Sequence, residues 1–219
     1  MARNKIKYSV TRFENNVDYI PPFIEGKYNI PFIKPEPYVE AQWLPFNYAG
    51  STTYKREERG IHFFVYDYYF QSLWSMREKY KDMLPQFKAV MAPDFSLYVD
   101  WPVMVQMWNH YRKHLIGSWM QSIGCRVYPV IRWAGQETYE WCFDGEPYKG
   151  TVCVSSVGMT KDKNMLRMFI DGYQAMMDIL KPETIIFNGH IPNECQGNIV
   201  QIEPFSKRFS EVKKKNDKT

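Results

Sequence analysis

The sequence lacks the features of several large protein classes. No apolar run approaches the roughly 20 residues that a membrane-spanning helix needs, and the start, Met1–Lys5, leads into no apolar signal region. The four cysteines among 219 residues form no C-x-x-C pair, so zinc-ribbon and redox-dithiol motifs are excluded. We therefore expect a cytoplasmic protein with free thiols and no membrane partner.

Motifs of common enzymes are also missing. The chain contains no G-x-G-x-x-G, no P-loop and no G-x-S-x-G. His110 and His114 are spaced i, i+4, but no glutamate stands between them as in H-E-x-x-H enzymes, and no third ligand is close in sequence. We expect these histidines on the surface of a helix. No metal site is predicted, and the sequence specifies no cofactor.

Positive charge is concentrated at the ends of the chain. Lys and Arg number 28 against 24 Asp and Glu, a net charge of +4. Residues 205–219 hold six basic and two acidic residues and thus account for all of it, while residues 1–12 add four basic residues and no acid. Such ends could contact a phosphate backbone, or they could be solvated, frayed termini. We predict that residues 205–219 form a flexible basic tail.

Proline sets the first part of the chain apart. Six of the 14 prolines lie between Pro21 and Pro45, interleaved with aromatic residues. Proline disfavours helix interiors, so an extended segment is expected, held by aromatic packing. We predict an arm over residues 1–60 packed on a single α/β domain over residues 61–204.

Hydrophobic periodicity changes after Gly60. Helical spacing predicts helices over 69–84, over 101–123 and from about residue 161 to 181, the last capped by Thr160 or Asp162. In the second helix, the stripe that contains Val103, Met104 and Trp108 is expected to face the core. Short apolar runs predict buried strands over 61–66, 87–91, 126–131, 151–155 and 183–187.

Alternating strands and helices of these lengths indicate parallel strands with right-handed helical crossovers. We therefore predict an α/β fold and favour a barrel-like or incomplete barrel arrangement over an open sheet.

Parallel α/β folds bind ligands at the carboxyl ends of their strands. Asp94 is the first candidate there, a catalytic carboxylate held by the stiff turn at Pro93, although an Asx-turn or a helix cap would use the same residue. Asp67 and His190 are weaker candidates, and Asp67 could be a helix cap. The predicted substrate-binding residues are Ser96, Asn109, Arg112, Trp133, Ser155 and Asn188.

Each binding candidate has a chemical reason. The Trp133 ring could stack on a base or sugar, or belong to the core. Arg112 and Ser155 could hold phosphate, and Asn188 could read a polar edge. The turn Ser155–Gly158 precedes a predicted helix, whose N-terminal amides could cradle a phosphate.

Several blocks of residues together are typical of one family. They are Pro93-Asp94-Phe95-Ser96-Leu97-Tyr98, Trp108-Asn109-x-x-Arg112, Cys142-Phe143-Asp144-Gly145 and Val154-Ser155-x-x-Gly158. In these blocks the chain resembles the domain of unknown function 4417 family over roughly residues 61–189. The resemblance implies an accessory protein of phages, plasmids and integrative elements with no established reaction. It supports the strand-end residues but supplies no mechanism.

Two functional hypotheses follow. The first is an enzyme acting on a nucleotide or nucleic acid, for which hydrolysis of a glycosidic bond needs the fewest groups: one carboxylate and a stacking pocket. The second is a non-enzymatic mobile-element protein that binds a host or defence factor through its aromatic arm and basic tail.

Overall fold

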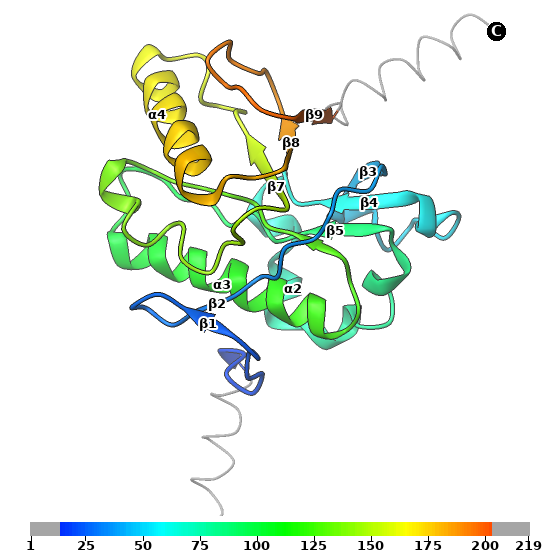
Figure 1. Cartoon of the computed structure of the whole chain (residues 1–219). Helices are drawn as coiled ribbons and strands as arrows, with labels where there is room; N and C mark the ends of the chain where they lie inside the picture. Colours follow the sequence, from blue (N-terminus) through cyan, green and yellow to red (C-terminus); the bar gives the residue numbers. More distant parts are fainter. Residues whose placement is uncertain (1–13, 203–219) are drawn as a thin grey trace, which may run out of the picture.

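Parallel strands joined by helices form the body of the computed structural model, which describes residues 14–202 (Figure 1). One sheet has the order β3-β4-β5-β6 and a second the order β7-β8-β9, all pairs being parallel. Strand order thus follows chain order, as successive crossover connections produce. The strands are β3 (Gln42–Pro45), β4 (Arg59–His62), β5 (Ala89–Met91), β6 (Val127–Tyr128), β7 (Thr151–Ser155), β8 (Thr184–Asn188) and β9 (Ile199–Ile202).

A parallel bridge connects the two sheets. Val130, just beyond β6, is bridged to Cys153 in β7, and the Ile131 amide donates to the Cys153 carbonyl at 2.8 Å. Within residues 14–202, β9 does not pair with β3, so the strands do not close into a barrel. The predicted α/β class with parallel strands and helical crossovers is confirmed. The described strands follow one another in chain order, as they do in a barrel, but they do not close into one.

Two long helices make the crossovers. α3 (Val103–Ser122) connects β5 to β6, and α4 (Lys163–Leu180) connects β7 to β8. Figure 1 shows α4 beside β7 and β8, with α3 running beneath the first sheet. Asp162 caps α4, because its Oδ1 accepts the amides of Asn164 and Met165 at 2.9 and 3.0 Å.

The helix predicted over residues 69–84 is wrong. The chain forms short pieces instead, and its backbone leaves the helical region at Met76, with φ −144° and ψ 43°. The next residue, Arg77, is 4% exposed and pairs with Asp18 at 2.5 Å. This inward ion pair requires the chain to turn where the periodicity would have continued the helix. The pieces are η3 (Asp67–Tyr69), α2 (Gln71–Ser75), η4 (Arg77–Tyr80) and η5 (Leu84–Gln86).

Residues 14–59 pack closely on the body. β1 (Ile24–Glu25) and β2 (Ile30–Pro31) form an antiparallel hairpin whose β2 lies against α3. Gly117 of α3 permits this approach, since a Cβ there would lie 2.5 Å from the Ile33 side chain. The same segment supplies β3, a strand that the proline content concealed. The remaining short helices are η1 (Phe46–Tyr48), η2 (Arg56–Glu58) and η6 (Gln136–Thr138).

The expected inward stripe of α3 is wrong in the first half of the helix. Val103, Met104 and Trp108 are 51%, 71% and 40% exposed. Polar side chains take the buried positions because they have hydrogen-bond partners in the body, as described below. No helix among the described residues is long and apolar enough to cross a bilayer. The predicted basic tail, 205–219, lies outside the described residues.

Candidate functional site

A cavity of about 210 Å³ lies where the chain leaves β5, β6 and β7. Its polar lining includes Ser96, Arg132 and Ser155, each from the segment at or beyond one of these strands. α4 closes the other side, with Met165, Met168 and Phe169 against Trp133. The carboxyl-end edge predicted to hold the site is therefore hollow.

Asp94 does not line this cavity; it lies behind Arg132. Its two carboxylate oxygens accept hydrogen bonds from Nε and Nη2 of Arg132, both at 2.5 Å. Asp94 is 4% exposed, whereas the Arg132 side chain is 26% exposed. Burial opposes the charge of the guanidinium, but the carboxylate outweighs burial and raises the pKa of Arg132. Asp94 thus holds Arg132 in the cavity wall.

Four other candidates form one hydrogen-bonded chain. Asp67 accepts the Ser96 amide at 3.1 Å and the Ser96 hydroxyl at 2.8 Å. Asn109 donates to the Ser96 carbonyl and accepts from Arg112, both at 2.6 Å. The Arg112 guanidinium also lies 3.9 Å from the centre of the Phe95 ring, and burial lowers its pKa. Of these four residues only Ser96 reaches the cavity, so the others act as its support.

Ser155 and Asn188 also meet. The Asn188 amide donates to Ser155 Oγ at 3.0 Å, and the Val157 amide donates to the same oxygen at 3.3 Å. The Ser155 hydroxyl proton can therefore point elsewhere. The His190 side chain is exposed and does not line the cavity, and its carbonyl accepts from Ser156 Oγ at 2.5 Å.

Trp133 lines the cavity and also belongs to the hydrophobic core. It is 7% exposed, and its ring lies 5.4 Å from that of Phe169. A Cβ on Gly172 of α4 would lie 2.1 Å from the indole nitrogen, so only glycine leaves room for this ring. The two roles that the sequence left open are therefore not exclusive.

The predicted phosphate cradle at the start of α4 is wrong. Asp162 occupies the amides of the first turn and places a carboxylate there. A second anion would be repelled at this end of the helix.

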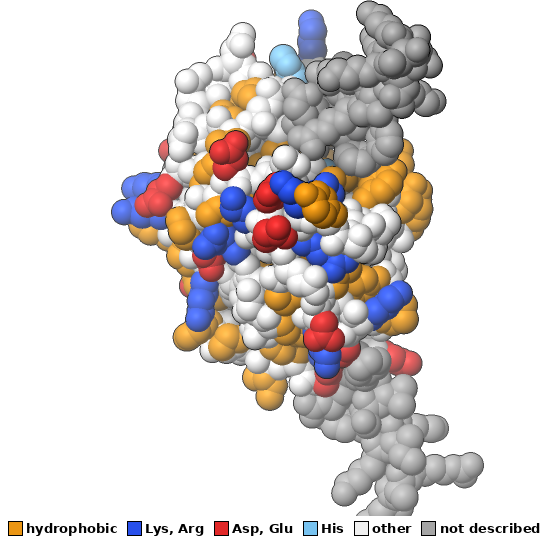
Figure 2. Space-filling view, turned by 90° about the vertical axis from the view of Figure 1, so that its right-hand side faces the viewer, with side chains coloured by type: hydrophobic (Ala, Val, Ile, Leu, Met, Phe, Trp, Pro, Cys, Tyr) orange, Lys and Arg blue, Asp and Glu red, His pale blue; other side chains and the backbone are white. Residues whose placement is uncertain are grey.

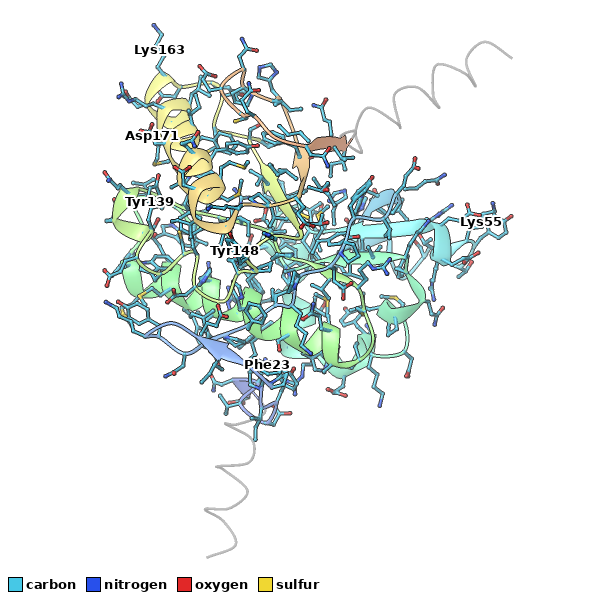
Figure 3. The ribbon with its side chains drawn as sticks, in the orientation of Figure 1. Phe23, Lys55, Tyr139, Tyr148, Lys163 and Asp171 are labelled. Carbon is cyan, nitrogen blue, oxygen red and sulfur yellow. The ribbon has the colours of Figure 1, made fainter. Side chains whose placement is uncertain are left out.

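A shallow depression lies outside the cavity. Tyr139 and Asp171, both labelled in Figure 3, line it from the segment after η6 and from α4. Burial raises the pKa of Tyr139 to about 12, with a contribution from Asp171. No residue predicted from the sequence lies there.

The sequence reasoning missed a buried polar cluster on the inner face of α3. His110 and His114, expected on the surface, are both 0% exposed. They lie with Glu146, which is 3% exposed, and one ligand atom of each lies within 4.8 Å of the others. Lys113 forms an ion pair with Glu146 and donates to the Val130 carbonyl at 2.8 Å. Two signals could have found the cluster: the i, i+4 spacing of His110 and His114, and the position of Glu146 directly after the Cys142–Gly145 block.

Comparisons with known proteins place the chain in a family. The model of the domain of unknown function DUF4417 matches residues 23–206. The chain belongs to this family. It is 34% identical to the Gene 1 protein of Mycobacterium phage L5 over 165 residues, which are 75% of this chain and 72% of the relative. It is also 34% identical to the Gene 1 protein of Mycobacterium phage D29 over 182 residues, 81% of this chain and 66% of the relative. No solved structure matches the chain significantly.

The comparisons confirm the resemblance found in the sequence. The family is phage-associated and its function is unknown. The match begins within the N-terminal segment, at residue 23, and so extends well before the blocks on which the resemblance was recognised.

Proposed function

We propose that the cavity binds a nucleotide or a nucleotide-like ligand through an aromatic wall and one guanidinium. The observation that carries this is the placement of Arg132, held by Asp94 at the wall of a cavity that Trp133 and Phe169 also line. Within residues 14–202, Nη1 of Arg132 has no recorded hydrogen bond, so a ligand anion can take it. A planar base against an aromatic wall and an anion on arginine are both favourable contacts.

The size of the cavity limits the ligand. About 210 Å³ is below the roughly 300–1,000 Å³ of most drug-sized ligand sites, so a base or one nucleotide fits better than a longer chain. The face in Figure 2 shows basic and acidic side chains interspersed, with no broad basic area on the described part. Wrapping of a duplex needs such an area.

Binding has more support than glycosidic-bond hydrolysis. The residues that line the cavity include no aspartate or glutamate within the described chain. Asp94 would have to release Arg132 before it could act as a general base or nucleophile, because both of its oxygens are paired.

The test is a melting screen of the full chain with nucleobases, nucleosides and mononucleotides. A ligand at 100 times its Kd adds about 2.7 kcal/mol to stability. Met168→Trp places a large ring in the cavity wall and should weaken or abolish the shift, whereas Ile179→Trp, a similar change on an exposed part of α4, should keep it. Absence of any shift in the wild type, or an equal loss in both variants, would contradict the proposal.

A protein partner is the second candidate function. Tyr66, Tyr68 and Met104 are 74%, 67% and 71% exposed, and Tyr98 and Trp101 add further aromatic surface. Large exposed aromatic groups mark partner surfaces, where Tyr and Trp dominate the energy. The part of this surface formed by residues 98–108 contains one charged residue, Asp100, and therefore none of the cations that a nucleic acid would need.

Photo-crosslinking from position 104 in a bacterial host tests this candidate. A captured protein must then bind the purified chain directly, and Met104→Glu must weaken that binding while Ile179→Glu does not. Equal affinity of both variants would reject the surface.

A further inference from the structure

The buried cluster of His110, His114 and Glu146 has a hydrogen-bonding pattern with too few donors. His110 Nε2 lies 3.0 Å from the Asp144 carbonyl, and His114 Nδ1 lies 2.9 Å from the Pro31 carbonyl. A carbonyl can only accept, so each ring must carry its proton on that nitrogen. The other nitrogen of a neutral ring then has a lone pair.

The other two ring nitrogens point into the cluster. Both rings are fully buried, and His110 Nδ1 has no hydrogen-bond partner among the described residues. His114 Nε2 faces Glu146 Oε1 at 3.0 Å. A ring whose proton is held by a backbone carbonyl presents the lone pair of its second nitrogen, which is the form of histidine that ligates a metal.

Glu146 presents more acceptor atoms to the same space. It forms an ion pair with the Lys113 ammonium, as a carboxylate does. Its Oε1 lies 3.0 Å from His114 Nε2. Its Oε2 and His110 Nδ1 are buried without a hydrogen-bond partner among the described residues.

We propose that His110, His114 and Glu146 bind one divalent transition-metal ion of the zinc type. Such an ion takes imidazole nitrogen and carboxylate oxygen at about 2.0–2.2 Å, so two of its ligand atoms lie about 3.3–3.6 Å apart in tetrahedral geometry. It would satisfy both unpaired atoms and separate His114 Nε2 from Glu146 Oε1. Mg²⁺ and Ca²⁺ fit less well, since they prefer oxygen ligands.

The surroundings have the features of a supported site. Histidines that ligate metals usually donate their other N–H to a backbone carbonyl or a carboxylate, as both rings do here. Gly145 lets the backbone pass close to His114, because a Cβ there would lie 2.9 Å from both His114 Nδ1 and the Pro31 carbonyl. Lys113 binds Oε1 and leaves Oε2 for the ion.

All three ligands are buried, so a substrate cannot reach an ion held by them, and we assign the ion a structural role. Its ligands come from α3 and from the segment before β7, and the Pro31 carbonyl ties β2 to the same cluster. The ion would thus fasten the N-terminal hairpin, α3 and the second sheet together. This role is independent of ligand binding in the strand-end cavity.

The experiment uses the untagged full chain and zinc alone. Because the ligands are buried, zinc is added both to the native protein and during refolding from urea, and bound metal is counted by mass spectrometry after gel filtration. We expect about one zinc per chain and a higher melting temperature. Changing a group that only supports a metal ligand weakens metal binding about 10–100-fold. His110→Gln removes a ligand itself, so it should weaken zinc binding at least tenfold.

Two controls keep the outcome decisive. His190→Gln removes an exposed histidine outside the cluster and should bind zinc like the wild type. Cobalt in the wild type should give the visible absorption of a tetrahedral or five-coordinate site, a readout that needs no variant to fold. No zinc in either preparation and no cobalt spectrum, or equal binding by His110→Gln and the wild type, would overturn the proposal. Lys113 alone would then balance Glu146.

Discussion

Two buried carboxylates in this protein are paired to different degrees. Both oxygens of Asp94 accept from Arg132, so that pair is complete. Glu146 has two neighbours on Oε1, Lys113 and His114, and none on Oε2 among the described residues. A complete pair positions a side chain, here Arg132 at the cavity. An incomplete one points to a missing partner, because buried polar atoms in native proteins are rarely unpaired.

The largest effect is expected from removing the charge of Glu146. Glu146→Gln leaves the Lys113 ammonium buried, with its side chain 3% exposed and no counter-ion. Breaking a buried pair in this way costs about 3–5 kcal/mol, which urea unfolding in the presence of a chelator would measure. The double variant Lys113→Met, Glu146→Leu removes both charges and should recover most of the loss. If the double variant is no more stable than Glu146→Gln, the unpaired charge is not the cause of the lost stability.

The Asp94–Arg132 pair should respond asymmetrically. Arg132→Gln strands a carboxylate that is 4% exposed and should cost about 3–5 kcal/mol. Asp94→Asn leaves a guanidinium that is 26% exposed and can take up water, so about 1–3 kcal/mol is expected. Chemical denaturation measures the free energy of unfolding of both variants. A larger loss in Asp94→Asn than in Arg132→Gln would mean that Asp94, and not Arg132, is the solvated partner.

Gly172→Ala tests how tightly the Trp133 ring is packed in the cavity wall. The new Cβ would lie 2.1 Å from the Trp133 indole nitrogen, so the ring must shift. Overpacking of this kind costs about 1–3 kcal/mol. A changed fluorescence spectrum should accompany the loss. Gln174→Ala, at an exposed position of the same helix, is the control, and equal effects in both variants would remove the argument for a tight wall.

The sequence predicted the strands better than the clusters, for a physical reason. Short apolar runs bounded by turn residues are a local signal, and they located the strands over 151–155 and 183–187 almost to the residue. Glu146 is 32 residues from His114, and only the fold brings them together. Periodicity also misplaced Met104, since it cannot show that Asn109 and Lys113 have inward partners.

The sequence predicted where the strand-end site lies better than what its residues do. The carboxyl-end rule located the cavity and three of its lining residues, Ser96, Trp133 and Ser155, because parallel strands share one edge. It could not show that Asp94 faces Arg132, because a carboxylate after a strand has the same sequence signature whether free or paired. The break at Met76 was hidden for a similar reason, since the attraction of Arg77 to Asp18 spans 59 residues.

The smallest loss of stability is expected at Tyr128. Its hydroxyl, like the Asp94 carboxylate, has its hydrogen-bond partners, but it carries no charge. Tyr128 is buried, and its hydroxyl accepts the Val39 amide and donates to the Pro37 carbonyl, both at 2.9 Å. Tyr128→Phe removes both bonds and should cost about 1–2 kcal/mol by urea unfolding. Tyr173→Phe, which loses a single bond to the Gln196 carbonyl, should cost less.

The pH dependence of this variant separates pairing from charge. Burial raises the pKa of Tyr128 from 10.0 to about 12, so between these values the unfolded chain is ionised and the folded chain is not. Unfolding releases a proton in that window. The stability that Tyr128 contributes is therefore complete below pH 10 and declines as the pH rises toward 12. The difference between wild type and Tyr128→Phe should be constant from pH 7 to 9 and shrink above pH 10; a constant difference up to pH 12 would show that the hydroxyl is not buried.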